Sequence, residues 1–303
     1  MLSERFVEKL NQLLHSLGDH ELIQGITGVD GGSINQTVCL SNQKNKYFLK
    51  FNHQPLPGMF EVESYGLELI RGTHSVRVPQ VLAVGKADQD SPAFLLLEWL
   101  ETVTQSQKVN PQFLLGQQVA QMHLAQHNSD QGLFGLDRAN YIGSTPQKND
   151  WKNEWMFFFR DQRLGFQRDL AVKNGVMPIG RLRKLDFVID HLDRFIGDRN
   201  TVKSSLLHGD LWGGNIQRNG DGYALIDPAV YYGDHEADLA FTELFGGFSQ
   251  AFYKGYAEVF PIDPGYKTRK DLYNLYHLLN HLNLFGEQYG SQVDDILQNY
   301  SGS

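Results

Sequence analysis

The sequence predicts an α+β chain in two lobes: an N-terminal lobe built on an antiparallel sheet and a larger, mostly helical C-terminal lobe. The length of 303 residues is at the size where a single hydrophobic core usually stops growing. Short runs of strand type, separated by glycine and asparagine turns, dominate the first hundred residues, whereas helical periodicity dominates the rest. We expect the lobes to be residues 1–100 and 101–303.

The N-terminal lobe opens with a predicted helix. Apolar residues recur at helical spacing over residues 3–18, with Ser3 as the N-cap and Gly18 at the end. Runs of strand type follow, and the first three are expected to form an antiparallel meander. The predicted strands cover residues 22–29, 34–41, 46–52, 80–85 and 93–98, and a helix is predicted over residues 57–72.

The C-terminal lobe is predicted to be helical with one interruption. Residues 205–232 hold short apolar runs broken by Gly and Asp, as expected for a small hairpin that carries a site. His277 and His281 lie one helical turn apart without an acidic partner at a metal-binding spacing, so we expect ordinary helix residues. The predicted helices cover residues 110–127, 151–173, 179–196, 249–259 and 267–286.

Composition excludes several classes of protein. A net charge of -8 argues against nucleic acid as a partner, because binding to phosphate backbones needs a basic surface. The single cysteine, Cys39, excludes an internal disulfide framework and a multi-cysteine zinc site, which is typical of the cytoplasm. No apolar stretch approaches the length of a membrane span, and the N-terminus lacks a signal-peptide pattern. We therefore expect no membrane association.

The strongest signal for chemistry lies in residues 206–227. Asp210 is followed after four residues by Asn215, and Asp227 ends an apolar strand about a dozen residues later. Phosphoryl transfer from ATP needs a carboxylate that accepts the proton of the attacking hydroxyl, and oxygen ligands for Mg²⁺. This spacing predicts Asp210 as the catalytic base and Asn215 and Asp227 as metal ligands. The alternative is that Asp210 and Asn215 only cap a tight turn.

The same segment is similar to the H-x-D-x-x-x-x-N pattern of protein kinases, which is followed by their magnesium-binding Asp. It departs from that pattern in two places. Gly209 stands where protein kinases have Arg, and Asp227-Pro228 replaces Asp-Phe-Gly. The glycine in place of arginine therefore indicates a kinase other than a protein kinase.

A kinase also needs a phosphate-covering loop, a lysine on a strand and an acid that orients the lysine. The glycine-rich residues 28–35 lie between two predicted strands and would let backbone amides approach phosphate oxygens, although a plain hairpin turn is the alternative. Lys50 ends a predicted strand and would pair with the ATP phosphates, unless it is a surface lysine. Its partner is expected among Glu61, Glu63 and Glu68, and the spacing of the following apolar residues favours Glu63.

The last strand of the N-terminal lobe is expected to run into a hinge. The backbone of Glu98 and Leu100 would bond the adenine edge, and a buried strand without a ligand is the alternative. The expected nucleotide-binding residues are Gly31, Gly32, Ser33, Lys50, Glu63, Glu98, Trp99 and Leu100.

Four segments, LLHGDLWGGNI, LIDPAVYYGDHEADLA, GGSINQ and VPQVLAVG, together resemble the fructosamine kinase family, or ketosamine 3-kinases, within the aminoglycoside phosphotransferase-like superfamily. The resemblance covers nearly the whole chain. It implies a bilobal protein-kinase-like fold, ATP and Mg²⁺ as cofactors, and phosphorylation of a fructosamine or ribulosamine at the 3-hydroxyl, which leads to deglycation. Rival hypotheses are an aminoglycoside, a choline-like alcohol or a sugar as acceptor, and a catalytically silent nucleotide-binding module.

The resemblance also implies roles for residues around the catalytic segment. Asp238, like its counterpart in related kinases, would tie down the catalytic loop, and it is expected with His208 to be structural. Four residues that lie beside this segment are expected to line the sugar pocket, and one of them, Asp234, would face the substrate amine. Packing or capping is the alternative for all four. Some relatives carry a redox-relevant cysteine in the glycine-rich loop, where this chain has Ser33. The residues expected to line the sugar pocket are Trp212, Tyr231, Tyr232 and Asp234.

Overall fold

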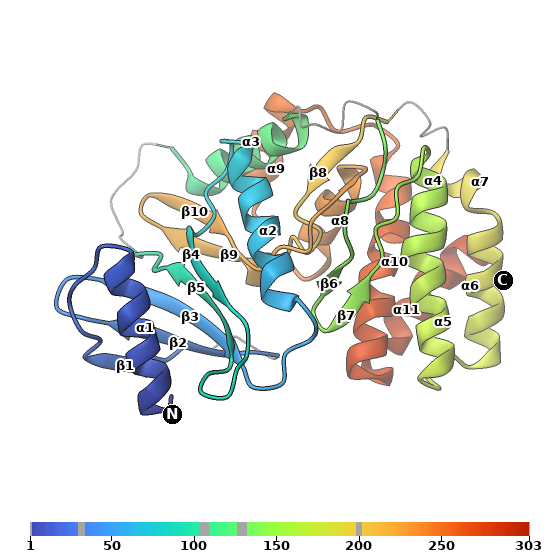
Figure 1. Ribbon diagram of the computed structural model, residues 1–303. Coiled ribbons are helices and arrows are strands. Elements are labelled where there is room, and N and C mark those ends of the chain that lie inside the picture. Colours follow the sequence, from blue (N-terminus) through green and yellow to red (C-terminus); the bar gives the residue numbers. More distant parts are fainter. Residues whose placement is uncertain (1, 30–33, 103–108, 126–131, 198–201, 303) are drawn as a thin grey trace.

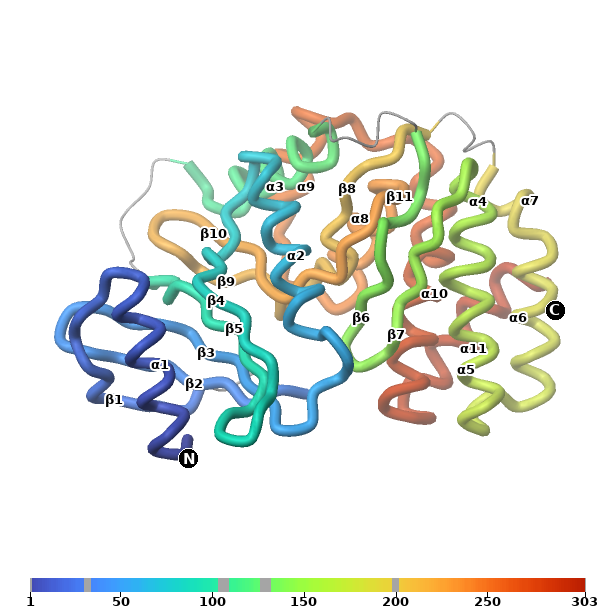
Figure 2. Tube along the Cα trace, in the orientation of Figure 1, coloured from blue at the N-terminus to red at the C-terminus, as the bar shows by residue number. Residues whose placement is uncertain are grey.

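The chain forms an antiparallel sheet at one end and a larger helical assembly at the other, which confirms the α+β fold class (Figure 1). Residues 205–232, which we call the catalytic segment, lie between the two parts (Figure 2). The C-terminus lies on the far side of the helices from the sheet. The computed structural model describes residues 2–29, 34–102, 109–125, 132–197 and 202–302.

The sheet has five strands in the order β1-β2-β3-β5-β4, and every neighbouring pair is antiparallel. The first three strands form the predicted meander. In β3 the side chains alternate, so that Leu49 and Phe51 bury on one face and Lys50 points to the other. The strands are β1 (Gly25–Gly28), β2 (Gln36–Ser41), β3 (Lys46–Asn52), β4 (Val81–Gly85) and β5 (Ala93–Glu98).

One helix covers each face of this sheet. Helix α1 (Glu4–Ser16) begins at Ser3, whose hydroxyl accepts a hydrogen bond from the amide of Phe6 at 3.2 Å. Its apolar stripe packs against the face that carries Leu49. Helix α2 (Met59–Gly72) packs on the opposite face.

Helix α2 also contacts the catalytic segment. A Cβ on Gly66 would lie 3.2 Å from Val230 and 3.3 Å from Pro228, so the glycine allows close approach of helix and loop. The hydroxyl of Tyr141, in the helical part, donates to the carbonyl of Pro57, just before α2, at 2.9 Å. The sheet and the helical part are therefore joined through α2.

The described residues of the helical part include three short strand pairs: β6 (Asn140–Ile142) with β7 (Thr145–Gln147), β8 (Ser205–Leu207) with β11 (Tyr231–Gly233), and β9 (Ile216–Asn219) with β10 (Gly222–Leu225). Its helices are α3 (Pro111–Leu124), α4 (Trp155–Phe158), η1 (Phe159–Gly165), α5 (Phe166–Lys173), α6 (Ile179–Asp190), α7 (Leu192–Ile196), η2 (Gly213–Asn215), α8 (Glu236–Leu244), α9 (Gln250–Val259), α10 (Tyr266–Phe285), η3 (Glu287–Tyr289) and α11 (Gly290–Ser301).

Two predicted helices differ from the structure. The helix expected over residues 151–173 begins at Trp155 and contains a π-helical stretch, η1, around the fully buried Arg163. The helix expected over residues 179–196 breaks at His191. Both irregularities depend on packing and hydrogen bonding, which the helical periodicity of the apolar residues does not predict. Among the described residues, no helix is long and apolar enough to cross a bilayer.

Candidate active site

A buried carboxylate holds the backbone of the catalytic loop that follows β8. Asp238, in the first turn of α8, accepts hydrogen bonds from the amides of His208 at 2.7 Å and Gly209 at 2.9 Å. His123 of α3 lies 3.2 Å from the same carboxylate through Nε2, and its Nδ1 lies 2.8 Å from the hydroxyl of Tyr256 on α9. Three helices therefore converge on the loop that presents Asp210.

Gly209 explains why this loop departs from the protein-kinase pattern. Its φ is +79°, and a Cβ at this position would lie 2.0 Å from the carbonyl oxygen of Ala229. The close approach accompanies a hydrogen bond from the Ala229 amide to the His208 carbonyl at 2.8 Å. No side chain, and so no arginine, fits here without moving one of the two segments.

His208 joins the loop to the strand that ends at Asp227. Its Nε2 lies 3.0 Å from the carbonyl oxygen of Ile226 and donates to it, while Nδ1 accepts from the Asp210 amide at 3.3 Å. Burial lowers the pKa of His208, and the neutral ring satisfies both contacts. The Ile226 amide in turn donates to the Asn215 carbonyl at 3.0 Å. The three segments that carry Asp210, Asn215 and Asp227 are thereby tied together.

Asp210 and Asn215 contact each other directly. The Nδ2 group of Asn215 donates to the Asp210 carbonyl and to its Oδ2, each at 2.8 Å, which turns the amide oxygen away from Asp210. Burial raises the pKa of Asp210 to about 7, the hydrogen bond from Asn215 opposes the shift, and the charges of Asp227 and Asp238 add to it. A carboxylate that titrates near neutral pH suits a general base.

Lys50 connects the sheet to the catalytic segment. Its Nζ lies 2.7 Å from Oε1 of Glu63 on α2 and also contacts Oδ1 of Asp227. Burial would lower the pKa of Lys50, but the charges of Asp227 and Glu63 outweigh it and raise that pKa. Of the candidate partners, Glu63 faces Lys50 while Glu61 is exposed. Asp227 itself has φ +56°, an uncommon backbone conformation that functional sites often contain.

The expected hinge follows β5. The amide of Glu98 donates to the carbonyl of Gln80 at 2.9 Å, and its carboxylate pairs with Arg77. Trp99 lies beside Phe48 with 6.4 Å between ring centroids, and Leu100 is buried. Gly31, Gly32 and Ser33 lie outside the residues that the structure describes.

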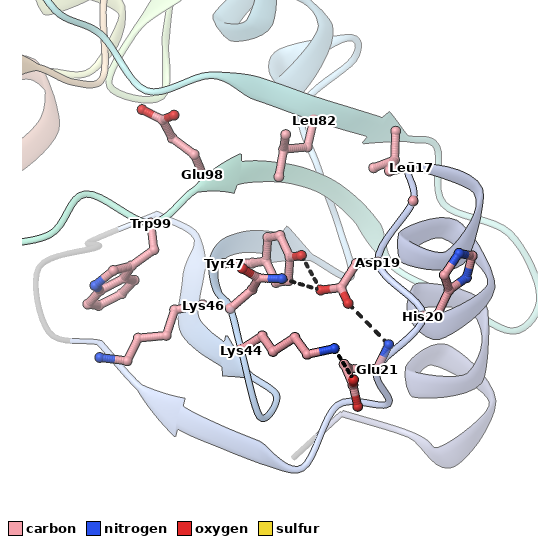
Figure 3. Close-up of a pocket in the computed structure, with 12 residues that line it drawn as sticks. Leu17, Asp19, His20, Glu21, Lys44, Lys46, Tyr47, Leu82, Glu98 and Trp99 are labelled. Atoms are coloured by element: carbon pink, nitrogen blue, oxygen red, sulfur yellow. Dashed lines mark hydrogen bonds and ion pairs between the residues drawn. The ribbon is translucent and has the colours of Figure 1, made fainter.

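A hollow of about 490 Å³ lies on the outer side of the sheet, between the end of α1 and the turn before β3 (Figure 3). Glu98 and Trp99 line it, whereas Lys50 and the catalytic loop do not. Its polar groups largely bond to one another, since Tyr47 donates to Asp19 and Lys44 pairs with Glu21 at 2.6 Å. We read it as a structural feature separate from the catalytic centre.

The four residues expected to line a sugar pocket differ in how far they are buried. Asp234 is fully buried and accepts from the Tyr273 hydroxyl at 2.8 Å. Tyr231 and Tyr232 are also buried, and the guanidinium of Arg163 lies 4.0 Å from the Tyr231 ring centroid. Trp212 is the exception, with 37% of its surface exposed. A role for the three buried side chains in the sugar pocket stays a prediction.

The described residues contain no cluster of three His, Cys, Asp or Glu side chains arranged for a metal ion. The oxygen donors at the centre are instead the carboxylate of Asp227, whose side chain is 45% exposed, and the amide oxygen of Asn215. Two such donors leave room for the phosphate oxygens and waters with which Mg²⁺ completes its coordination in kinases. The residues present therefore fit magnesium held together with a nucleotide.

The sheet with its lysine and acid, joined to a helical part that presents Asp210, defines an ATP-dependent phosphotransferase of protein-kinase-like fold. The family model described as fructosamine kinase matches residues 6–302, and the chain belongs to this family. It is 43% identical to the probable ketoamine kinase of Vibrio parahaemolyticus over 88% of each chain. It is 37% identical to the chloroplastic protein-ribulosamine 3-kinase of Oryza sativa subsp. indica, over 97% of this chain and 83% of that protein.

A solved structure supports the same assignment. The crystal structure of the "putative fructosamine-3-kinase" of Haemophilus somnus superposes with a TM-score of 0.84 at 29% identity, covering 96% of each chain. The likeness therefore extends through both the sheet and the helical part.

Proposed function

We propose that this enzyme transfers the γ-phosphoryl group of ATP to the 3-hydroxyl of a ketoamine, a ribulosamine or fructosamine. The relatives named ketoamine kinase and ribulosamine 3-kinase support the substrate class. The observation that carries the chemistry is Asp210, which the loop presents beside Asn215 with its pKa raised to about 7.

In this proposal residues 1–100 form the nucleotide lobe and residues 101–303 the catalytic lobe. Lys50, oriented by Glu63 at 2.7 Å, would bind the α- and β-phosphates, and Gly31, Gly32 and Ser33 would cover them. The backbone from Glu98 to Leu100 would hold adenine. We expect the enzyme to work in the cytoplasm, where the single, half-buried Cys39 stays reduced.

Asn215 and Asp227 would hold Mg²⁺, which when bound neutralises charge on the phosphates. Asp210 would align the 3-hydroxyl and accept its proton as oxygen attacks the γ-phosphorus and the bond to the β-phosphate oxygen breaks. Positioning and charge neutralisation then supply most of the rate enhancement. The 3-phosphate is a good leaving group once the sugar enolises towards C1, and hydrolysis of the resulting imine releases the amine.

An acceptor screen tests this function. Purified enzyme with ATP and Mg²⁺ is offered ribulosyl and fructosyl amines, the free sugars, the free amines, choline and an aminoglycoside, and ADP formation is measured. We expect turnover with the ketoamines alone, and phosphorus-coupled carbon NMR should place the phosphate on O3. Turnover with choline, an aminoglycoside or a free sugar but no ketoamine would overturn the proposal, as would the absence of any turnover.

A further inference from the structure

An aromatic shelf extends from the catalytic loop across the ends of α8 and α10. Neighbouring ring centroids lie 6.1 Å apart between Trp212 and Phe245, 5.1 Å between Phe245 and His281, 5.6 Å between His281 and Phe285, and 4.9 Å between His281 and Tyr289. Three of the rings are open to solvent: Trp212 and Phe245 are each 37% exposed and Phe285 is 49% exposed. We call Trp212, Phe245, His281, Phe285 and Tyr289 the aromatic shelf.

Glycines fix the shelf at its catalytic end. The Trp212 ring lies over Gly214, where a Cβ would come within 2.3 Å of the indole. A Cβ on Gly213 would lie 2.8 Å from the carbonyl oxygen of Gly246, so the loop after Asp210 packs directly against the chain after Phe245. The shelf is therefore built before any ligand arrives. Contiguous exposed aromatic surface of this kind usually marks a binding site.

His281 provides a hydrogen-bond acceptor among the shelf rings. His281 Nδ1 lies 2.8 Å from the carbonyl oxygen of His277, one turn earlier on α10, and must donate to it. Burial lowers the pKa of His281, so the ring is neutral and its Nε2 is an acceptor. Beneath the shelf, Phe241 and His277 stack with centroids 3.6 Å apart. The shelf is thus an aromatic surface without a charged ring, and the Nε2 of His281 can accept a hydrogen bond from an N–H donor.

The far end of the shelf approaches the chain that leaves the glycine-rich loop. Leu284 on α10 and Ile34 both reach Gly143: a Cβ there would lie 3.3 Å from the Leu284 side chain and 3.7 Å from that of Ile34. At the near end, Trp212 follows Asp210 by two residues. The shelf therefore runs outward from the loop that carries Asp210 to the end of α10, where Leu284 and Ile34 both lie close to Gly143.

We propose that the aromatic shelf binds the substituent carried on the ketoamine nitrogen and makes the enzyme selective for hydrophobic, especially aromatic, amines. This inference rests on the proposed function. In a ketoamine the nitrogen is bonded to C1, two carbons from the 3-hydroxyl, so a sugar that places O3 at Asp210 directs this substituent away from the sugar and onto the rings. Aromatic contacts and the acceptor on His281 then add affinity in the bound complex.

Three ketoamines with the same sugar, made from methylamine, butylamine and 2-phenylethylamine, test the inference. We expect KM to fall along this series, roughly tenfold in total, because hydrophobic contacts of this size discriminate by about that factor. Phe285→Ala should shrink the ratio of kcat/KM between the phenylethyl and methyl substrates to about twofold. Phe245→Leu, which keeps an apolar side chain beside Phe241, should reduce the same ratio to a smaller degree.

Phe187→Ala is the matched control, since Phe187 has the same 37% exposure as Phe245 but lies on α6 against His191. It should keep the wild-type ratio. Equal KM values for the three ketoamines, or an unchanged ratio in Phe285→Ala, would overturn the shelf assignment and leave the proposed function intact. Failure of the wild-type enzyme to phosphorylate any of the three would instead overturn the proposed function, and the shelf assignment with it.

Discussion

Two regions of the catalytic centre are held by different kinds of interaction. Lys50, on the sheet, is held through its ammonium group, which makes ion pairs and hydrogen bonds with Glu63 and Asp227. The loop before Asp210 is held by backbone amides donating to the buried Asp238, and by a glycine packed on a carbonyl. An ion pair can exchange one partner for a phosphate, whereas a buried amide that loses its acceptor has no replacement. The sheet side is therefore the adaptable side, and the loop is the fixed one.

Asp210→Asn removes the proposed catalytic base, which the fixed loop presents, and should have the largest effect on kcat. The amide keeps the shape of the loop and can still accept from Asn215, but it cannot take the proton of the attacking hydroxyl. We expect kcat to fall at least about a thousandfold, the range in which a lost general base combines with lost alignment.

The measurement is steady-state turnover, with nucleotide affinity followed separately by calorimetry. If Lys50 and Glu63 govern nucleotide binding, the variant should bind ATP within about twofold of wild type, since the change removes no contact on the sheet side. Near-normal turnover would show that another group is the base.

Gly209→Ala tests the fixed side. The added methyl would overlap the Ala229 carbonyl, and the left-handed conformation of a non-glycine residue costs about 1–3 kcal/mol. We expect a Tm lower by several degrees and a large loss of kcat, because Asp210 moves with the loop. Gly222→Ala is the control: Gly222 has no neighbour within 4 Å of a Cβ, and its Tm should stay near wild type.

Glu63→Gln tests the adaptable side and should have a smaller effect. Without this carboxylate Lys50 stays on Asp227 rather than turning to the phosphates, so KM for ATP should rise roughly tenfold, about the value of one charge-assisted hydrogen bond. Glu61→Gln changes an exposed acid on the same helix and should leave KM unchanged. Equal effects of the two substitutions on KM for ATP would show that the contact between Glu63 and Lys50 does not contribute to nucleotide binding.

Much of this arrangement can be predicted from the sequence, because its signals are local. The five strands follow from alternation and turn residues, and α1 follows from its apolar stripe and Ser3. The spacing of Asp210, Asn215 and Asp227 is a local signal of the same kind. The strands, α1 and the catalytic spacing can each be recognised from residues that lie close together in the sequence.

Other elements depend on contacts that a local pattern does not contain. The sequence pattern does not predict α8, because Glu236, Asp238 and Thr242 are buried together with the apolar residues between them, so the helix has no separate polar and apolar faces. Nor does it predict α11 or the β6–β7 hairpin. His123 contacts Asp238 and Tyr256 contacts His123. Both come from helices far from Asp238 in the chain, so only the fold brings these residues together. For the same reason the burial of Asp234 could not be inferred from its place beside the motif.

The last prediction concerns stability rather than activity, in the absence of nucleotide and magnesium. Burial raises the pKa of Asp210 from its ordinary 3.8 to about 7, so the folded state holds this proton more tightly than the unfolded state. Stability from this group is therefore fully present below about pH 4, and it is lost as pH rises to about 7. Asp210→Asn removes the loss, so its Tm should exceed that of wild type at pH 8 and approach wild type at pH 4.

The comparison uses the difference in Tm between variant and wild type at each pH, which cancels the titration of other groups. Asp221→Asn, a change in the exposed turn between β9 and β10, should give a difference that does not vary with pH. If the Asp210→Asn difference were equally flat, the carboxylate would not be desolvated in the folded enzyme. Within the part of the chain that the structure describes, the loop holds Asp210 through backbone contacts and gives it no cationic partner. Ionisation of this carboxylate therefore lowers the stability of the folded enzyme.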